Sequence, residues 1–176
     1  MSKAWPVAGI DPAGTLAENA RIILGVRTAE FFSYTAIVDR EDAVEELHAL
    51  RIAAKRLRYT LELFRDVFGA PGERLIDTVK AMQEELGEVH DHDVRLDLIA
   101  AEIAGVAAED DDSGSTDSDP RTGLIALAAR ETAGRGRHYQ AFRTLWARHA
   151  AQMRASLVGL SAMTVPDAVA ERRHTV

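Results

Sequence analysis

The sequence predicts an all-α fold, an antiparallel helical bundle of about five or six helices. Three observations support this prediction. Apolar residues recur at helical spacing along most of the 176-residue chain. The composition is 47% hydrophobic but only 6% aromatic, and it is rich in Ala, Leu and Arg, which favour helices. Short Gly and Pro connections separate the periodic stretches, so neighbouring helices should run antiparallel within one domain.

The N-terminal part predicts a lead-in followed by a capped helix. Residues 1–14 contain Gly and Pro and are expected to form a flexible lead-in to a helical domain over 15–160. Thr15 and Glu18 have the spacing of a capping box, which predicts a first helix from Thr15 to about Val38.

The second helix, predicted over 42–68, is the most regular part of the chain. Its apolar residues form one stripe, made of Leu47, Leu50, Ala54, Leu57, Leu61, Phe64 and Phe68. Gly69 and Pro71 follow this stripe, and together they should end the helix. We therefore expect a tight αα-hairpin at this point.

A third helix is predicted over 73–87. Gly87 should end it, and either Asp91 or Asp93 is suitably placed to cap the start of a fourth helix.

Helical periodicity resumes over 120–160, where Gly134 and Gly136 predict a break into two helices. Residues 161–176 lack periodicity and should form a frayed tail.

The net charge of −7 is concentrated in one segment. Residues 109–119 hold six of the acidic residues and no apolar ones, so we expect an acidic mobile loop there. Subtracting those six charges leaves −1, so an anionic ligand is compatible with the rest of the chain. In a second interpretation, the acidic loop competes with a ligand for basic residues.

Composition excludes several classes of protein. The absence of cysteine excludes disulfides, thiolate metal sites and thiol catalysis. No apolar run approaches the roughly 20 residues that cross a bilayer, and the N-terminus lacks the apolar core of a secretory signal. We therefore expect a cytoplasmic protein without a membrane partner.

A row of cations lies along the second helix, beside its apolar stripe. On a helical wheel with His48 at zero, Arg51, Lys55 and Arg58 lie at roughly 300°, 340° and 280°, while the stripe centres near 200°. The segment from His48 to Tyr59 contains no carboxylate, whereas solvated helices usually interleave both charges. We call Arg51, Lys55 and Arg58 the basic row, and expect it to face a groove between helices that suits a polyanion.

The second helix and the segment 86–94 both resemble the conserved-histidine α-helical domain, the CHAD family. The matching spacing in the second helix is His48-x-x-Arg51-x-x-x-Lys55-Arg56-x-Arg58-Tyr59. The matching letters in the later segment are Leu86-Gly87-Glu88 followed by Asp91-x-Asp93-Val94.

This resemblance implies an all-helical module that binds inorganic polyphosphate without catalysis and associates with polyphosphate granules. It implies that His48, Arg56 and the basic row line the anion site. The family's usual module is longer and carries the histidine-basic motif in both of two related halves, whereas this chain shows it once. A homo-oligomer, in which a second copy supplies the missing motif, is therefore an alternative to a monomer.

Several other residues are candidates for the same site. Arg21 in the first helix, and Arg135 and His138 in the last part of the chain, are candidate polyphosphate ligands, although His138 also fits the edge of the core. Asp91 is either a helix cap or a carboxylate that orients the cations, as the resemblance favours. Glu62 follows Arg58 by one turn, so the two residues can form an ion pair.

Two other functions are alternatives to polyphosphate binding. A metal-dependent phosphohydrolase needs carboxylates and histidines that converge on an ion, but consecutive residues in His90-Asp91-His92-Asp93 point in different directions. We therefore expect no catalytic residues, no metal and no cofactor. A nucleic-acid-binding or structural module is the other alternative, although Tyr59 is the single aromatic residue beside the basic row.

Overall fold

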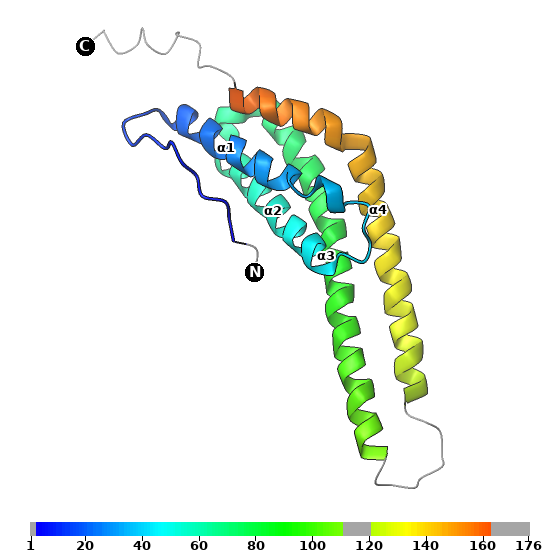
Figure 1. The fold of residues 1–176 in the computed structure, drawn as a ribbon. Helices are drawn as coiled ribbons and strands as arrows, with labels where there is room; N and C mark the ends of the chain where they lie inside the picture. The colour runs from blue at the N-terminus through cyan, green and yellow to red at the C-terminus, as the bar shows by residue number, and fades with distance from the viewer. Residues whose placement is uncertain (1–2, 111–120, 163–176) are drawn as a thin grey trace, which may run out of the picture.

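The structure, a computed structural model, describes residues 3–110 and 121–162. Most of the acidic segment 109–119 and most of the tail 161–176 lie outside these residues. The described part is all-helical, which confirms the predicted fold class. In chain order the elements are α1 (Leu16–Phe32), the 3₁₀ helix η1 (Thr35–Ile37), α2 (Val44–Leu63), α3 (Arg65–Asp110) and α4 (Arg121–Ala162), as shown in Figure 1.

The capping box predicted for the first helix is present. The Thr15 hydroxyl accepts a hydrogen bond from the Glu18 amide, and the Glu18 carboxylate accepts one from the Thr15 amide at 2.7 Å. The helix ends at Phe32, before the predicted end near Val38, because the chain tightens into η1. The lead-in is non-helical, as expected, but it is tied to α1: the Trp5 amide donates to Glu30, and Arg27 donates to the Trp5 carbonyl.

The chain reverses direction between α2 and α3 by means of two interruptions. Phe64 leaves the helical conformation and ends α2 five residues before the predicted boundary. Gly69 then adopts a positive φ of 54°, a conformation that glycine enters without steric penalty, and this produces a kink near the start of α3. The predicted hairpin at Gly69 and Pro71 is therefore confirmed.

The prediction of five or six helices was too high for the described residues, where four α-helices are present. The helix α3 continues through Gly87, and α4 continues through Gly134 and Gly136. An isolated glycine inside a helix costs only about 1 kcal/mol, which tertiary packing readily offsets. Asp91 and Asp93 therefore lie inside α3 and cap no helix.

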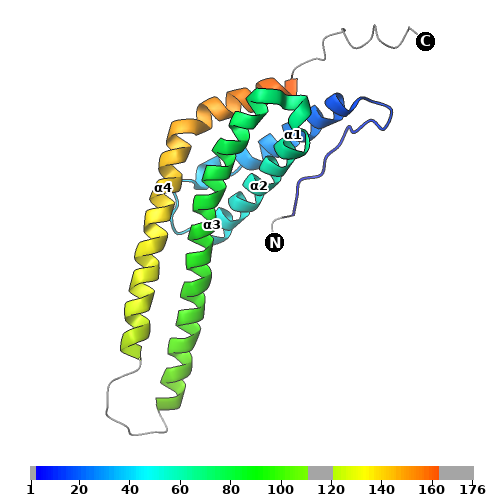
Figure 2. The ribbon, with the colours of Figure 1, turned by 180° about the vertical axis from the view of Figure 1, so that it is seen from behind.

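The bundle has a packed end and a projecting arm. Helices α3 and α4 run side by side as a long hairpin, and α1 and α2 cover only the half of it nearest the C-terminal end of α4 (Figures 1 and 2). The core is centred on α2, whose Leu47, Leu50, Leu57 and Leu61 are at most 1% exposed. Among residues 3–110 and 121–162, no helix combines the length and apolar character needed to span a membrane.

Candidate functional site

The basic row of α2 lies along the line where α2 packs against α3, which we call the α2–α3 seam. The two helices are antiparallel, so a forward step along α2 corresponds to a backward step along α3. His48 contacts His90, Arg51 lies beside Gly87, and Arg58 contacts Gln83. The seam therefore places Gln83, Gly87 and His90, none of which is a carboxylate, opposite the basic row and the histidine at its start.

His48 and His90 form a hydrogen-bonded pair at this seam. Their Nδ1 atoms are 3.1 Å apart, so one ring donates and the other accepts. Burial lowers the pKa of His48 below its ordinary value of 6.5, and the neighbouring His90 and Arg51 lower it further. His48 is therefore neutral at pH 7 in the unliganded protein.

Arg51 lies beside α3 at Gly87. A Cβ atom at residue 87 would come within 3.7 Å of the Arg51 Nε atom. Arg51 is half-buried, and among the residues that the structure describes it forms no ion pair. A guanidinium group in this position keeps its donors available for a ligand.

Arg58 is held more firmly than the other two members of the basic row. Its Nε donates to Gln83 at 3.0 Å, and a terminal nitrogen donates to Glu62 at 2.7 Å. The predicted ion pair with Glu62 is thus confirmed. Lys55 is exposed, and Tyr59 lies next to both cations, with its ring centre 4.7 Å from the Arg58 guanidinium carbon and 5.6 Å from the Lys55 ammonium nitrogen.

Arg56 does not join the basic row in the structure. Its side chain points toward α1, where it donates to Glu30 at 2.7 Å. Glu30 is 1% exposed and also accepts from Arg27 and from the Trp5 amide. Arg56 therefore belongs to a buried ionic network that joins α1, α2 and the lead-in.

The structure also separates Arg135 and His138 from the basic row, because both side chains lie where α3 packs against α4. We call this line the α3–α4 seam. Arg135 is buried, and it donates to the Asp93 carboxylate and, at 2.9 Å, to the Glu41 carbonyl. His138 pairs with Glu85 at 2.8 Å. Arg135 is thus a packing residue, because its donors are already used within the fold.

Arg21 and Asp91 do not contact the basic row either. Arg21 lies on α1, which packs mainly against α2 and α4, and two of its guanidinium nitrogens are buried without a hydrogen-bond partner in the structure. Asp91 is exposed, and within the described ranges it forms no hydrogen bond with α2. The orienting role predicted for Asp91 therefore has no contact to support it. Gln83 and His90 are the α3 residues that contact Arg58 and His48. Periodicity did not predict them, because it does not give the register in which two helices pack.

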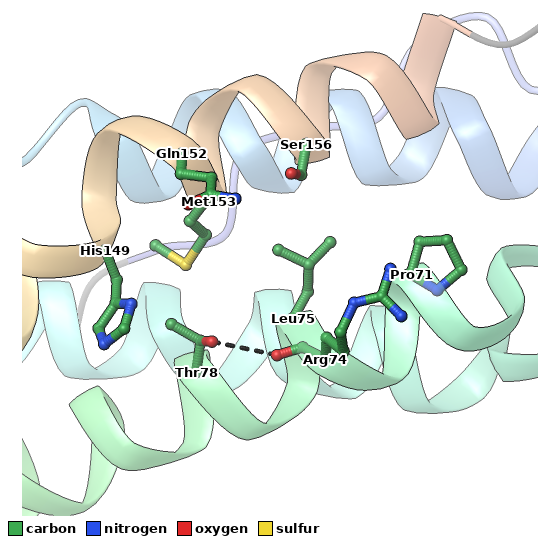
Figure 3. Close-up of a pocket in the computed structure, with 8 residues that line it drawn as sticks. All are labelled: Pro71, Arg74, Leu75, Thr78, His149, Gln152, Met153 and Ser156. Carbon is green, nitrogen blue, oxygen red and sulfur yellow. Dashed lines mark hydrogen bonds between the residues drawn. The ribbon is translucent and has the colours of Figure 1, made fainter.

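A pocket of about 210 Å³ lies elsewhere, between α3 and the C-terminal part of α4 (Figure 3). Arg74 and His149 are the residues of its lining that carry or can acquire positive charge, and Leu75 and Met153 are apolar. A second pocket of about 380 Å³ lies beside Arg143 and Trp146. Neither pocket contains a residue of the basic row, so the predicted groove along the α2–α3 seam stays a prediction.

Comparison with known proteins identifies a family. The model of the CHAD domain matches residues 3–100, which include α1, α2 and most of α3 but none of α4. No curated protein and no solved structure matches the chain. The matched segment is more than half of the chain and contains His48, the basic row and the Gly87 segment, so the chain belongs to the CHAD family.

Proposed function

We propose that this protein binds inorganic polyphosphate, or a related phosphate-rich polyanion, without catalysis. The site is the α2–α3 seam, where His48 and the basic row contact the ligand. One observation carries the proposal: half-buried Arg51 and exposed Lys55 form no ion pair among the described residues, and α3 places uncharged Gly87 beside Arg51. A half-buried guanidinium without a counter-ion is only partly solvated, and a bound phosphate chain would supply that counter-ion.

The binding mechanism is electrostatic. Arg51 and Arg58 donate in bidentate fashion to phosphate oxygens, whereas Lys55 acts as a mobile point charge. Because Arg51, Lys55 and Arg58 follow one another at about one helical turn, each can meet a successive phosphate of a repeating chain. His48 adds a neutral donor at pH 7 and a further cation when protonated. The CHAD match supports this proposal and the expectation of a place on polyphosphate granules in the cytoplasm.

The distribution of carboxylates favours binding over hydrolysis. A metal-assisted phosphoryl transfer needs acidic residues beside the cations that hold the substrate. Among the residues that the structure describes, Glu62 is the carboxylate that contacts the basic row, and it is engaged with Arg58. Incubation with polyphosphate and Mg²⁺ should therefore release no phosphate above the rate without protein.

The direct test replaces Arg51, Lys55 and Arg58 together by Ala. We expect polyphosphate affinity to fall on the order of 1,000-fold, because each of the three lost charge-assisted contacts contributes about 1.5 kcal/mol. Binding isotherms at two salt concentrations should also show that the salt dependence weakens by about two to three counterions.

The matched control replaces Arg130, Arg137 and Arg148 by Ala. These three residues are exposed on α4, so the control removes the same charge from another surface. Equal losses of affinity in the two triple variants would refute a site on the seam, and far-ultraviolet circular dichroism checks that both remain helical. Competition with single-stranded RNA at fixed salt separates polyphosphate binding from general nucleic-acid binding.

A further inference from the structure

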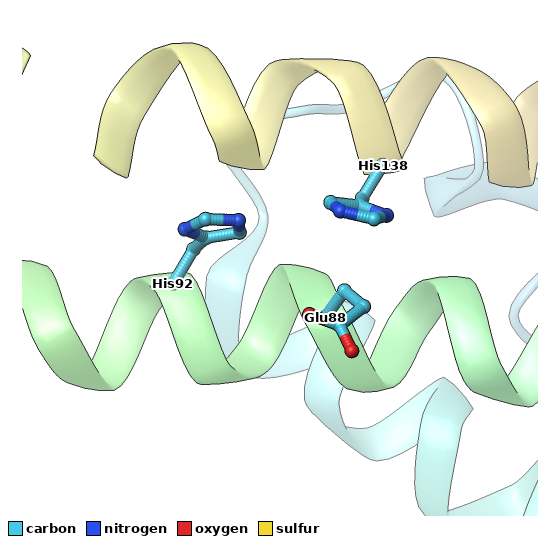
Figure 4. Close-up of side chains that lie close together, drawn as sticks. All are labelled: Glu88, His92 and His138. Carbon is cyan, nitrogen blue, oxygen red and sulfur yellow. The ribbon is translucent and has the colours of Figure 1, made fainter. Parts of the chain in front are cut away.

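Two histidines face each other across the α3–α4 seam, away from the basic row. His92 comes from α3 and His138 from α4, and their ring centres are 5.7 Å apart. Figure 4 shows that a nitrogen of each ring points toward the other ring and that the Glu88 carboxylate lies next to the gap. Glu88 precedes His92 by one helical turn, and one ligand atom from each of the three residues lies within 4.8 Å of the others.

The outer nitrogen of each ring is held by a carboxylate. His92 Nδ1 is 2.6 Å from a Glu131 oxygen, and His138 Nδ1 is 2.8 Å from a Glu85 oxygen. An ionised carboxylate can only accept, so the Nδ1 of His138 carries the hydrogen. The Nδ1 of His92 also lies 3.0 Å from an Arg95 nitrogen, which can only donate, and the shorter contact with Glu131 at 2.6 Å favours the hydrogen on Nδ1 here too. In the neutral tautomer this leaves a lone pair on each Nε2. Metal-binding histidines in proteins commonly show this arrangement, in which the carboxylate fixes the tautomer and the direction of the ring.

The surrounding packing and charge suit a cation. The His92 ring lies directly against Gly134 of α4, where a Cβ atom would come within 2.3 Å of the ring, so the ring has a fixed place in the seam. The Glu88 carboxylate lies next to the gap, and the carboxylates of Glu85 and Glu131 hold the outer ring nitrogens. Arg95 is the cation that contacts this group, through Glu131 and His92. The cluster therefore has an excess of negative charge that a divalent ion would neutralise.

We propose that Glu88, His92 and His138 bind one divalent transition-metal ion of the Zn²⁺ class. Two imidazole nitrogens and one carboxylate oxygen are the donors that Zn²⁺, Co²⁺ and Ni²⁺ accept, whereas Mg²⁺ and Ca²⁺ prefer oxygen alone. Bonds of about 2.0 Å to a tetrahedral ion bring ligand atoms to about 3.3 Å from one another, so the side chains must close inward. Glu88 is exposed and free to rotate toward the histidines.

The three residues come from both long helices, so the ion would link α3 to α4 and hold them together. The cluster is also separate from the proposed polyphosphate site. The α2–α3 seam uses Gln83, Gly87 and His90 of α3, whereas the cluster uses Glu88 and His92, which lie on a different face of the same helix. Failure of either proposal would leave the other standing.

The test is a metal titration of the full-length, untagged protein after treatment with a chelator. Zn²⁺ is added in competition with a chromophoric chelator, and Co²⁺ absorption reports the coordination number. We expect one equivalent of Zn²⁺ to bind, a Co²⁺ spectrum typical of a four-coordinate site, and no competition from millimolar Mg²⁺. Bound Zn²⁺ should raise the midpoint of thermal unfolding.

Two histidine variants make the comparison specific. His138→Gln should weaken Zn²⁺ binding at least 100-fold and remove the thermal shift, whereas His149→Gln, on the same helix but outside the cluster, should leave both unchanged. Glu131→Gln should weaken binding about 10- to 100-fold, as loss of an outer hydrogen-bond partner does. If His138→Gln fails to fold, the exposed Glu88→Gln supplies the same comparison.

Several outcomes would overturn the metal site. Equal affinity in His138→Gln and His149→Gln would place the ion elsewhere. Loss of binding in His90→Gln with retention in His138→Gln would assign the ion to the other histidine pair. An affinity weaker than about millimolar for the unmodified chain would leave no specific site to assign.

Discussion

Helix α3 takes part in two seams whose charges are arranged in opposite ways. Toward α2, it meets cations with neutral groups: Gly87 lies beside Arg51, and Gln83 accepts from Arg58. Toward α4, it meets a cation and an imidazole with carboxylates, as the pairs Asp93 with Arg135 and Glu85 with His138 illustrate. In a third pair the carboxylate is on α4, where Glu131 contacts His92 of α3. One helix therefore presents an acid-poor face and an acid-rich face.

This difference separates stabilising charge from charge that is available to a ligand. On the α3–α4 seam these side chains are hydrogen-bonded to one another, and removing Arg135 leaves the largely buried Asp93 without its partner. On the α2–α3 seam the cations repel one another, and the fold supplies only Glu62 as a compensating carboxylate within the described residues. Loss of a cation should therefore lower the stability of the fold at the α3–α4 seam and weaken ligand binding at the α2–α3 seam.

The largest expected effect comes from breaking a pair on the α3–α4 seam. Arg135→Ala removes the donors to Asp93 and to the Glu41 carbonyl, and it leaves the Asp93 carboxylate, whose side chain is 12% exposed, without its partner. We expect the free energy of unfolding to fall by about 3 kcal/mol. Urea denaturation followed by circular dichroism measures this change.

Arg130→Ala is the matched control for this prediction, since it removes an exposed arginine from the same helix. Its unfolding free energy should stay within about 0.5 kcal/mol of the unmodified protein. Polyphosphate affinity, measured where both variants are folded, should be unchanged in both. A large loss of affinity with intact stability in Arg135→Ala would move this residue back into the binding site.

The two seams also show which side-chain partners could be predicted from sequence. The wheel placed Arg51, Lys55 and Arg58 on one border of the α2 stripe, and the i,i+4 rule found Glu62, because both arguments need only one helix. On the same wheel Arg56 lies at roughly 80° from His48, across the stripe, so its pairing with Glu30 is consistent with periodicity. The family resemblance grouped Arg56 with the others because a motif records spacing and not direction.

Partners on other helices could not be predicted in this way. Arg135 pairs with Asp93 because α3 and α4 pack in one particular register, and periodicity does not give that register. The glycines were misread for a related reason. Their sequence context predicts helix ends at Gly87 and Gly134, whereas both lie inside helices: Gly134 allows the close approach of the His92 ring, and Gly87 leaves an ordinary contact distance to Arg51. A glycine has the same local signature in either role, and only its neighbours distinguish them.

A second prediction concerns a carboxylate added to the α2–α3 seam, which would give Arg51 the kind of partner that Arg135 has on the α3–α4 seam. Gly87→Glu places a carboxylate beside Arg51, where the added Cβ atom meets only an ordinary contact at 3.7 Å. The new ion pair should compete with phosphate, and polyphosphate affinity should fall about tenfold. A binding isotherm at low salt measures the change.

Gly87→Gln is the control, because it adds nearly the same volume without charge. Both variants replace glycine in a helix interior, so both should gain about 0.5 to 1 kcal/mol of stability. Affinity should fall clearly only in the Glu variant. Equal losses in the two variants would mean that space, and not the missing carboxylate, decides binding at this seam.

The smallest expected effect concerns His48 and pH. Its pKa is lowered below 6.5 by burial and then by His90 and Arg51, with Glu45 opposing them, so the unfolded chain binds more protons than the folded protein in this range. The stabilisation from neutral His48 is therefore complete above about pH 6.5. It is lost as the pH falls from 6.5 toward the lowered pKa. Without ligand, the unfolding free energy of the unmodified chain should fall over this window more than that of His48→Gln.

Polyphosphate binding should become stronger as the pH falls, since a polyanion beside His48 favours the protonated ring. Polyphosphate affinity should therefore rise about three- to tenfold between pH 7.5 and 5.5, with proton uptake on binding. In His48→Gln, which retains His90 and the basic row, the rise should shrink, and the difference between the two profiles belongs to His48. Isotherms in metal-free buffers that differ in ionisation enthalpy measure affinity and proton uptake together. Identical pH profiles in the two proteins would show that His48 makes no charged contact with the ligand, and would confine binding to the basic row.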